Sequence, residues 1–180
     1  MIARLDNWLE TKDKGLTVLL KPNTDCHITT LMLGSQPQIR TIRKYLVKFK
    51  ELCNLSSKKH HLFFILGNHN LYKWNDLVTE WAEKQGLPEN FHPVLLSVQN
   101  NKTIAQLLKS SHHTITRSGG LTSMELLKVE QKNASIHSDI IKKNKPVLKK
   151  MPPWEIGNAE VLINKIGAKI VHPDYLDSLH

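Results

Sequence analysis

The residues best suited to chemistry lie in one decapeptide, TRSGGLTSME, at positions 116–125. A β-like run, residues 113–116, precedes its two glycines, and a helix-like run, residues 121–129, follows them. Adjacent glycines between a strand and a helix let the backbone approach a ligand closely. The amides at the start of the helix can bind a phosphate, and Glu125, one turn further on, can accept hydroxyl hydrogens from the same ligand. This spacing indicates a nucleotide-diphosphate site.

The same decapeptide also fits a purely structural interpretation. Thr122 and Glu125 have the spacing of a capping box, in which the threonine caps the helix and the glutamate folds back onto the threonine amide. Those two residues alone favour the cap. The preceding Ser-Gly-Gly turn, together with a second motif at residues 154–159, favours ligand binding.

Strand-like and helix-like segments alternate around this decapeptide and must position it. Strands are expected near residues 28–33, 62–66, 93–98, 114–116, 146–148 and 169–171, and helices near 39–53, 71–85, 103–108, 121–129 and 158–166, with a polar interruption at 131–144. This alternation predicts an α/β fold, a Rossmann-like parallel sheet with helices on both faces and right-handed crossovers. Ligands of such sheets lie beyond the carboxyl ends of the strands, where the turns at 34, 67–70 and 118–120 also fall.

Composition limits the class of protein. With 180 residues, 40% of them hydrophobic, the chain suffices for one ordinary core and is too short for two large α/β domains. No apolar run approaches the roughly 20 residues that span a bilayer, and the first residues lack the apolar block of a signal peptide. Cys26 and Cys53 lack metal-ligand spacing, so we expect structural thiols in a reducing, cytoplasmic compartment.

Charge and histidine content suggest partners without identifying one. The formal net charge of +9 favours phosphates, nucleic acid or acidic lipid surfaces, and a solvated basic surface explains it equally well. The ten histidines invite a metal, but none has a ligand partner at i, i+4 in a helix, so no metal is expected. His69, in the turn at the ligand end of the sheet, could touch a substrate.

Residues 116–125 resemble the donor-site signature of GT-B glycosyltransferases, in the group that contains the peptidoglycan GlcNAc-transferase and the galactolipid and glucolipid synthases. That signature is a Ser-Gly-Gly or Ser-Gly-Ala turn, then a threonine, then a glutamate inside the helix. Residues 154–159, followed by Gly167-Ala168, are similar to the family's Gln-Glu/Gln-x-x-Asn-Ala helix start and Gly-Ala end. The turn at residues 34–36 fits the family's first phosphate-facing loop. The resemblance covers about residues 28–172.

The resemblance implies a donor-binding site drawn from three turns. Its members would be Gly34, Ser35, Gln36, Ser118, Gly119, Gly120, Thr122, Glu125, Trp154, Glu155 and Asn158. In the family pattern, Glu125 would bind ribose hydroxyls, while the amides of residues 118–120 and the Thr122 hydroxyl would hold the diphosphate. Glu155 would accept hydrogen bonds from the transferred sugar, and Asn158 would order the helix start. Neither a cofactor nor a metal is implied, because helix N-termini and amides stabilise the leaving diphosphate; the catalytic residue stays unknown.

Several positions keep two interpretations. Trp154 stands where relatives usually carry glutamine or another polar residue, which leaves the sugar open, and its indole either stacks on a ligand or does not. Glu155 also fits a first-turn carboxylate that faces the helix dipole. Arg117 either faces the phosphates or lies on the outer strand face. The run Ile136-His137-Ser138-Asp139, in a segment longer than the family pattern, either contacts a phosphate or sugar or forms a plain loop.

Length is the largest departure from the family, whose members have two Rossmann-like domains, with the acceptor bound by the N-terminal one. We expect residues 28–180 to be the nucleotide-sugar domain and residues 1–27 a connecting segment. The expected function is the donor-binding half of a hexosyltransferase that moves a sugar from a nucleotide diphosphate, with a UDP-sugar favoured, to an acceptor hydroxyl. Its partners would be the nucleotide-sugar and an N-terminal acceptor domain or partner subunit; peripheral contact with an acidic membrane is left open.

Three other functions remain as alternatives, one of them a non-catalytic binding subunit that recruits a membrane-bound partner. A fragment of a non-hydrolysing UDP-GlcNAc 2-epimerase would share the Ser-Gly-Gly turn but would follow it with consecutive acidic residues, where this chain has residues 122–125 as Thr-Ser-Met-Glu. A basic module that binds phosphate or nucleic acid would explain the charge. Against nucleic acid, the aromatic side chains fall on helix stripes and no binding motif is present.

Overall fold

The computed structural model describes residues 26–34, 37–66, 71–96, 99–149 and 151–176. In chain order the elements are β1 (Cys26–Met32), α3 (Ile39–Asn54), β2 (Lys59–Ile65), α4 (Leu71–Gln85), β3 (Phe91–Leu96), α5 (Asn101–Ser110), β4 (His113–Thr116), α6 (Gly120–Lys128), β5 (Ala134–His137), β6 (Ile141–Lys142), β7 (Lys145–Pro146), α7 (Pro153–Ile166), β8 (Lys169–Val171) and the 3₁₀ helix η1 (Pro173–Tyr175). Most of the predicted elements lie within a few residues of these bounds. The predicted connecting segment, residues 1–27, lies outside the described residues except for the start of β1.

Six strands form one parallel sheet in the order β3-β2-β1-β4-β5-β8. The chain first runs outward from β1 to β2 and β3, then returns to β4 and runs outward the other way. β1 and β4 pair directly, from Thr29 beside His113 to Met32 beside Thr116. Where the direction of winding reverses, the flanking loops part and leave a crevice at the carboxyl ends of the strands. The switch point of this sheet therefore lies between β1 and β4.

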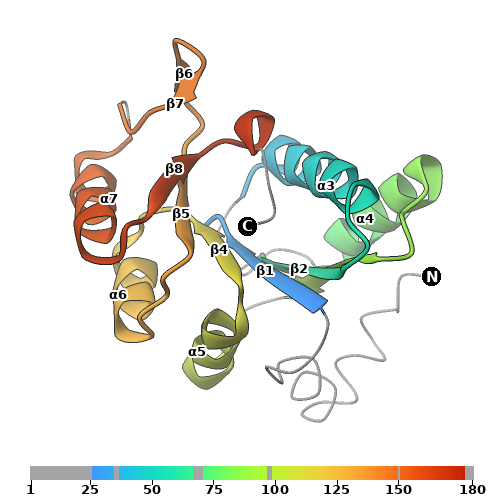
Figure 1. The fold of residues 1–180 in the computed structure, drawn as a ribbon, viewed down its shortest axis with the longest axis horizontal. Helices are drawn as coiled ribbons and strands as arrows, with labels where there is room; N and C mark the ends of the chain where they lie inside the picture. Colours follow the sequence, from blue (N-terminus) through green and yellow to red (C-terminus); the bar gives the residue numbers. More distant parts are fainter. Residues whose placement is uncertain (1–25, 35–36, 67–70, 97–98, 150, 177–180) are drawn as a thin grey trace.

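Helices cover both faces of the sheet, as predicted: α3 and α4 lie on one face, and α5, α6 and α7 lie on the other (Figure 1). Side chains at helical spacing along α3 are buried against the first face: Ile42, Tyr45, Leu46, Phe49, Leu52 and Cys53. On the second face, Leu108 of α5, Leu126 of α6 and Leu162 of α7 pack in one cluster. Burial on both sides explains why β1 and β2 are almost wholly buried.

The sequence predicted the segment between α6 and α7 least well. The polar interruption, whose form the sequence leaves open, contains β5, which pairs with β4 and β8 and is buried at all four residues. The strand predicted near 146–148 is wrong, because only Lys145–Pro146 is a strand, and it pairs antiparallel with β6 outside the main sheet. β5 escaped detection because Ser135 and His137 are polar. Tertiary partners bind both: Ser135 Oγ lies 2.8 Å from His113 Nε2, and the Tyr45 hydroxyl lies 2.9 Å from His137 Nδ1.

Histidines gather at the amino-terminal ends of the strands. His27 stacks on both His60 and His112 with ring centroids 4.8 Å apart, and His61 stacks on His92 at 4.9 Å. Burial, more than the neighbouring histidines, lowers the pKa of His60 to about 3 and that of His61 to about 4. These rings therefore stay neutral in the folded protein until the pH is far below the usual histidine range.

Acid should destabilise the fold through these rings. Their folded-state pKa values lie below the unfolded value of about 6.5, so the unfolded chain binds more protons between pH 6.5 and pH 4. The free energy of unfolding should fall with pH in that window, by up to about 1.4 kcal/mol per pH unit for each such histidine. Thermal unfolding from pH 7.5 to 4.5 measures this slope.

The variant His60→Leu isolates one ring, because neither ring nitrogen of His60 has a hydrogen-bond partner among the described residues and the side chain is buried. Its melting temperature should fall less steeply with acid than that of the wild type. Equal slopes for the two proteins would contradict the assignment of the acid sensitivity to His60.

Candidate functional site

Uncapped helix starts surround the switch point. The N-cap residues of α3, α6 and α7 are Gln38, Gly119 and Pro152, and none of them forms a side-chain cap hydrogen bond in the described part of the chain. By contrast α5, away from the switch point, is capped by Asn100, whose side chain accepts from the Thr103 amide at 2.9 Å. First-turn amides without a cap are free to bind an anion.

The capping box predicted as an alternative does not form. α6 begins at Gly120, so Thr122 is its third residue and Gly119 is the N-cap. Glu125 lies one turn into the helix, partly buried, and burial raises the pKa of its carboxyl. Thr122 and Glu125 therefore do not form this cap, and ligand binding by α6 stays a prediction.

The two sequence motifs are bonded to each other through Ser118. Its hydroxyl donates to the Glu155 carbonyl at 2.7 Å, and its own carbonyl accepts from Asn158 Nδ2 at 3.0 Å. Ser118 is fully buried. A Cβ at Gly120 would lie 3.9 Å from Asn158 Nδ2, so the glycine turn packs closely against α7. The pair of hydrogen bonds brings the starts of α6 and α7 together.

Arg117 spans the carboxyl edge of the sheet between two carboxylates. Its Nη2 lies 3.2 Å and its Nε 3.4 Å from Glu155 Oε2, and its Nη1 lies 3.7 Å from Asp139 Oδ2. On the β1 side, a Cβ at Gly34 would lie 4.0 Å from Arg117 Cδ, and Gly34 has a φ of +86°. A side chain at position 34 would therefore be strained and would face Arg117.

A buried polar chain behind Arg117 was not predicted from the sequence. Tyr45 Oη lies 2.9 Å from His137 Nδ1, and His137 Nε2 lies 2.9 Å from Asp139 Oδ1. Burial, assisted by the charge of Asp139, raises the pKa of the Tyr45 phenol well above its usual value. The hydrogen bond from His137, with the charge of Arg117, lowers the pKa of Asp139. The histidine and aspartate two positions apart were the available signal, but the sequence left open whether residues 136–139 contact a ligand or form a plain loop.

The structure brings most of the predicted site residues together. Gly34, Ser118, Gly119, Gly120, Thr122, Glu125, Glu155 and Asn158 all lie in or beside the turns that follow β1 and β4 or in the first turns of α6 and α7. Trp154 is at the start of α7 and 69% exposed. Ser35 and Gln36, and also His69, lie outside the described residues. The roles assigned to all these residues stay predictions.

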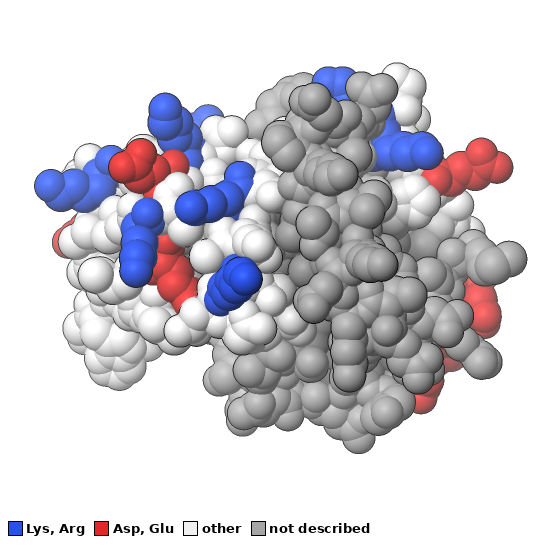
Figure 2. Space-filling model, turned by 90° about the horizontal axis from the view of Figure 1, so that it is seen from below, with Lys and Arg blue, Asp and Glu red and all other residues white. Residues whose placement is uncertain are grey.

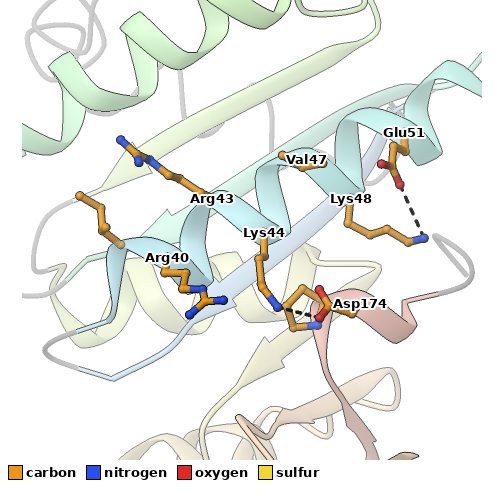
Figure 3. A pocket seen from close by; sticks show the side chains of 9 residues that line it. Arg40, Arg43, Lys44, Val47, Lys48, Glu51 and Asp174 are labelled. Carbon is orange, nitrogen blue, oxygen red and sulfur yellow. Dashed lines mark hydrogen bonds and ion pairs between the residues drawn. The ribbon is translucent and has the colours of Figure 1, made fainter. Parts of the chain in front are cut away.

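A separate groove of about 450 Å³ runs between α3 and η1. Figure 3 shows that α3 contributes basic side chains to it. One ion pair crosses the groove, Lys44 with Asp174 at 2.6 Å, and a second lies along α3, Lys48 with Glu51 at 3.7 Å. The lining residues are Ile39, Arg40, Arg43, Lys44, Val47, Lys48, Glu51, Pro173 and Asp174. None of them belongs to the predicted site, so the groove is a distinct surface.

Further charged side chains are visible on one face of the molecule. Figure 2 shows single basic side chains on the described part of the face seen from below, with acidic side chains between some of them. The described residues contain no group of three or more His, Cys, Asp or Glu side chains that could hold a metal ion. In the same residues, no helix is both long enough and apolar enough to cross a membrane.

Comparison with known proteins shows relatives only at the level of structure. No family model matches the sequence, and no curated protein does. Acinetobacter baumannii MurG, a glycosyltransferase, superposes with a TM-score of 0.55 at 14% identity over 92% of this chain and 42% of its own. The Methanocaldococcus jannaschii UDP-GlcNAc 2-epimerase, solved with UDP-GlcNAc and UDP, gives 0.53 at 10% identity over 94% and 41%. The chain thus spans about two fifths of either protein, and the likeness shows the fold alone.

Substitution of two buried serines near the site measures how much the hydrogen bonds between the glycine turn and α7 stabilise the protein. Ser118→Ala removes the buried hydroxyl that donates to the Glu155 carbonyl, so it should lower the free energy of unfolding by about 0.5–1.5 kcal/mol. Ser123 is also buried, but its hydroxyl has no hydrogen-bond partner within the described part of the chain, so Ser123→Ala should be neutral or slightly stabilising. Urea denaturation of both variants gives the comparison, and equal losses would contradict the structural role of the Ser118 hydroxyl.

Proposed function

We propose that this chain, which has the fold of the C-terminal half of GT-B proteins, is the donor-binding domain of a glycosyltransferase. Residues 28–180 would bind a nucleotide-sugar, with a UDP-sugar favoured, and an N-terminal domain or partner subunit would supply the acceptor. The coarser part of this proposal, a glycosyltransferase-like fold, is the part that the structural neighbours support. The donor, the acceptor and the transfer itself are our inference.

The observation that carries the proposal is the uncapped start of α6 at the switch point. Gly119 and Gly120 have no side chains of their own that could cover the first amides of α6. No side chain in the described part of the chain caps this helix start. Amides in that position, with the positive end of the helix dipole behind them, bind phosphate groups in many nucleotide sites. The Thr122 hydroxyl, half-exposed in the first turn, would add one donor. A metal would not be needed, since amides would offset the charge of the leaving diphosphate.

Glu125 would bind the nucleoside. Its carboxylate lies one turn beyond the phosphate-binding amides, and a carboxylate can accept hydrogen bonds from both hydroxyls of a ribose. Burial raises the pKa of this group, and a ribose would supply the donors that water supplies elsewhere. The base would lie beyond the ribose, and no residue described here distinguishes uracil from guanine.

Binding should depend on Glu125. In a thermal-shift and calorimetric screen of UDP, GDP and their sugars, a uridine nucleotide should stabilise the wild type. Glu125→Gln should weaken its binding about ten- to a hundredfold through the loss of a charged hydrogen bond, worth roughly 1.5–3 kcal/mol. Glu83→Gln, an exposed glutamate on α4, should bind as the wild type does. If neither uridine nor guanosine nucleotides stabilise the protein, the proposal is wrong.

Transfer should need a second domain. GT-B acceptor sites lie in the half that this chain does not match, so the isolated chain should hold the nucleotide-sugar without consuming it beyond slow hydrolysis. Product release should begin when a cognate acceptor half is added, as measured by UDP formation. Sugar transfer by the isolated chain would contradict this division of labour.

The epimerase neighbour keeps one alternative open. Its fold similarity equals that of the glycosyltransferase neighbour to within 0.02 in TM-score, although residues 122–125 lack the consecutive acidic residues expected of such enzymes. An epimerised UDP-sugar formed without any acceptor would favour this alternative. The dispersed basic side chains in Figure 2 give a nucleic-acid-binding module no comparable support.

A further inference from the structure

Asp139 lies at the proposed donor site although the family motifs do not include it. It follows β5, the neighbour of β4 in the sheet, and its Oδ2 lies 3.7 Å from Arg117 Nη1. On the other side of the same guanidinium, Glu155 Oε2 lies 3.2 Å from Nη2. The side chain of Asp139 is 46% exposed, whereas that of Glu155 is 16% exposed. We call this arrangement of Asp139, Arg117 and Glu155 the carboxylate bracket.

The position of Asp139 is set from inside the protein. In the tautomer with the hydrogen on Nε2, His137 donates to Asp139 at 2.9 Å and accepts the Tyr45 hydroxyl at Nδ1, also at 2.9 Å. Both Tyr45 and His137 are buried, so neither can reach a substrate. A carboxylate held on one oxygen by a buried donor keeps its second oxygen in a defined place. The inner residues therefore act as positioning residues for Asp139.

The charge of the carboxylate bracket matches hydroxyls better than phosphates. Two carboxylates around one guanidinium carry a net negative charge, and the guanidinium already donates hydrogen bonds to Glu155 and lies within ion-pair distance of Asp139. A diphosphate at this place would meet repulsion from both sides. Neutral hydroxyl groups, in contrast, donate to carboxylates in charge-assisted hydrogen bonds. The amides of α6 and α3, not the bracket, then suit the phosphates.

We propose that Asp139 is a specificity-determining residue that, together with Glu155, binds the hydroxyls of the donor's sugar, with Arg117 fixing the spacing between the two carboxylates. The inference rests on the proposed function and adds a residue that the family resemblance does not supply. The ligand class is a neutral polyhydroxylated ring attached to a nucleoside diphosphate. Tyr45 and His137 contribute only by orienting Asp139.

The test compares the affinity for a nucleotide-sugar with the affinity for the nucleotide alone. Titration calorimetry with UDP, UDP-glucose, UDP-galactose and UDP-N-acetylglucosamine gives the extra affinity that a sugar contributes in the wild type. In Asp139→Asn this extra affinity should fall about tenfold, because one charged acceptor is lost, while the affinity for UDP itself stays within about twofold. Tyr45→Phe should lower the extra affinity two- to threefold, again with UDP binding preserved.

Matched controls separate this role from a loss of stability. Asp174→Asn removes an exposed carboxylate that pairs with Lys44 on the groove side, and it should change neither affinity. A melting temperature for each variant shows that the protein is folded under the titration conditions. A merely structural Asp139 would lower both affinities together or neither, and would not change their ratio.

Each outcome decides between the proposals. Failure of UDP to bind the wild type overturns the proposed function and this inference with it. Binding of UDP with no extra affinity for any of the sugars tested overturns the inference alone. Equal weakening of UDP and UDP-sugar in Asp139→Asn also overturns it, because it would place Arg117 and its carboxylates at the phosphates. If Asp139→Asn lowers only the extra affinity that the sugar contributes and leaves the affinity for UDP unchanged, the inference is supported.

Discussion

Right-handed crossovers in a parallel sheet dictate the location of everything else in this molecule. Because such crossovers place the helices that follow β1 and β2 on one face and those around β4 and β5 on the other, the sheet must contain a pair of neighbouring strands whose following loops diverge. That pair is β1 and β4. The glycine turn after β4 therefore lies at the switch point. Its place there follows from the order of the strands and needs no individual side chain.

Local patterns predicted this framework well, for physical reasons. The apolar spacing of α3 and the continuous apolar run of β2 both reflect which side chains are excluded from water. Each pattern can be recognised within a short stretch of sequence. The two adjacent glycines predict a turn between a strand and a helix, and the Ser-Gly-Gly turn does lie between β4 and α6. The capping box was wrong because its spacing does not say where a helix begins, and α6 begins two residues before Thr122.

What the sequence could not show are contacts between distant polar residues. β5 is short and half polar, and only its burial between β4 and β8 reveals it as a strand. Tyr45 and His137 are 92 positions apart, so neither suggests the other. Histidines at the two ends of the sheet have different environments. His60, at the amino end, is buried, and its ring nitrogens have no hydrogen-bond partner among the described residues. Both ring nitrogens of His137, at the carboxyl end, have hydrogen-bond partners.

The hydrogen bonds between the glycine turn and α7 have an evolutionary consequence. Ser118 donates to one residue of the second motif and accepts from another, so substitutions on the two sides share partners and their effects should not add. A substitution at the start of α7 must keep the Glu155 carbonyl and the Asn158 side chain within reach of Ser118, or be accompanied by a change at Ser118. Tolerated changes in this region should therefore come as paired substitutions.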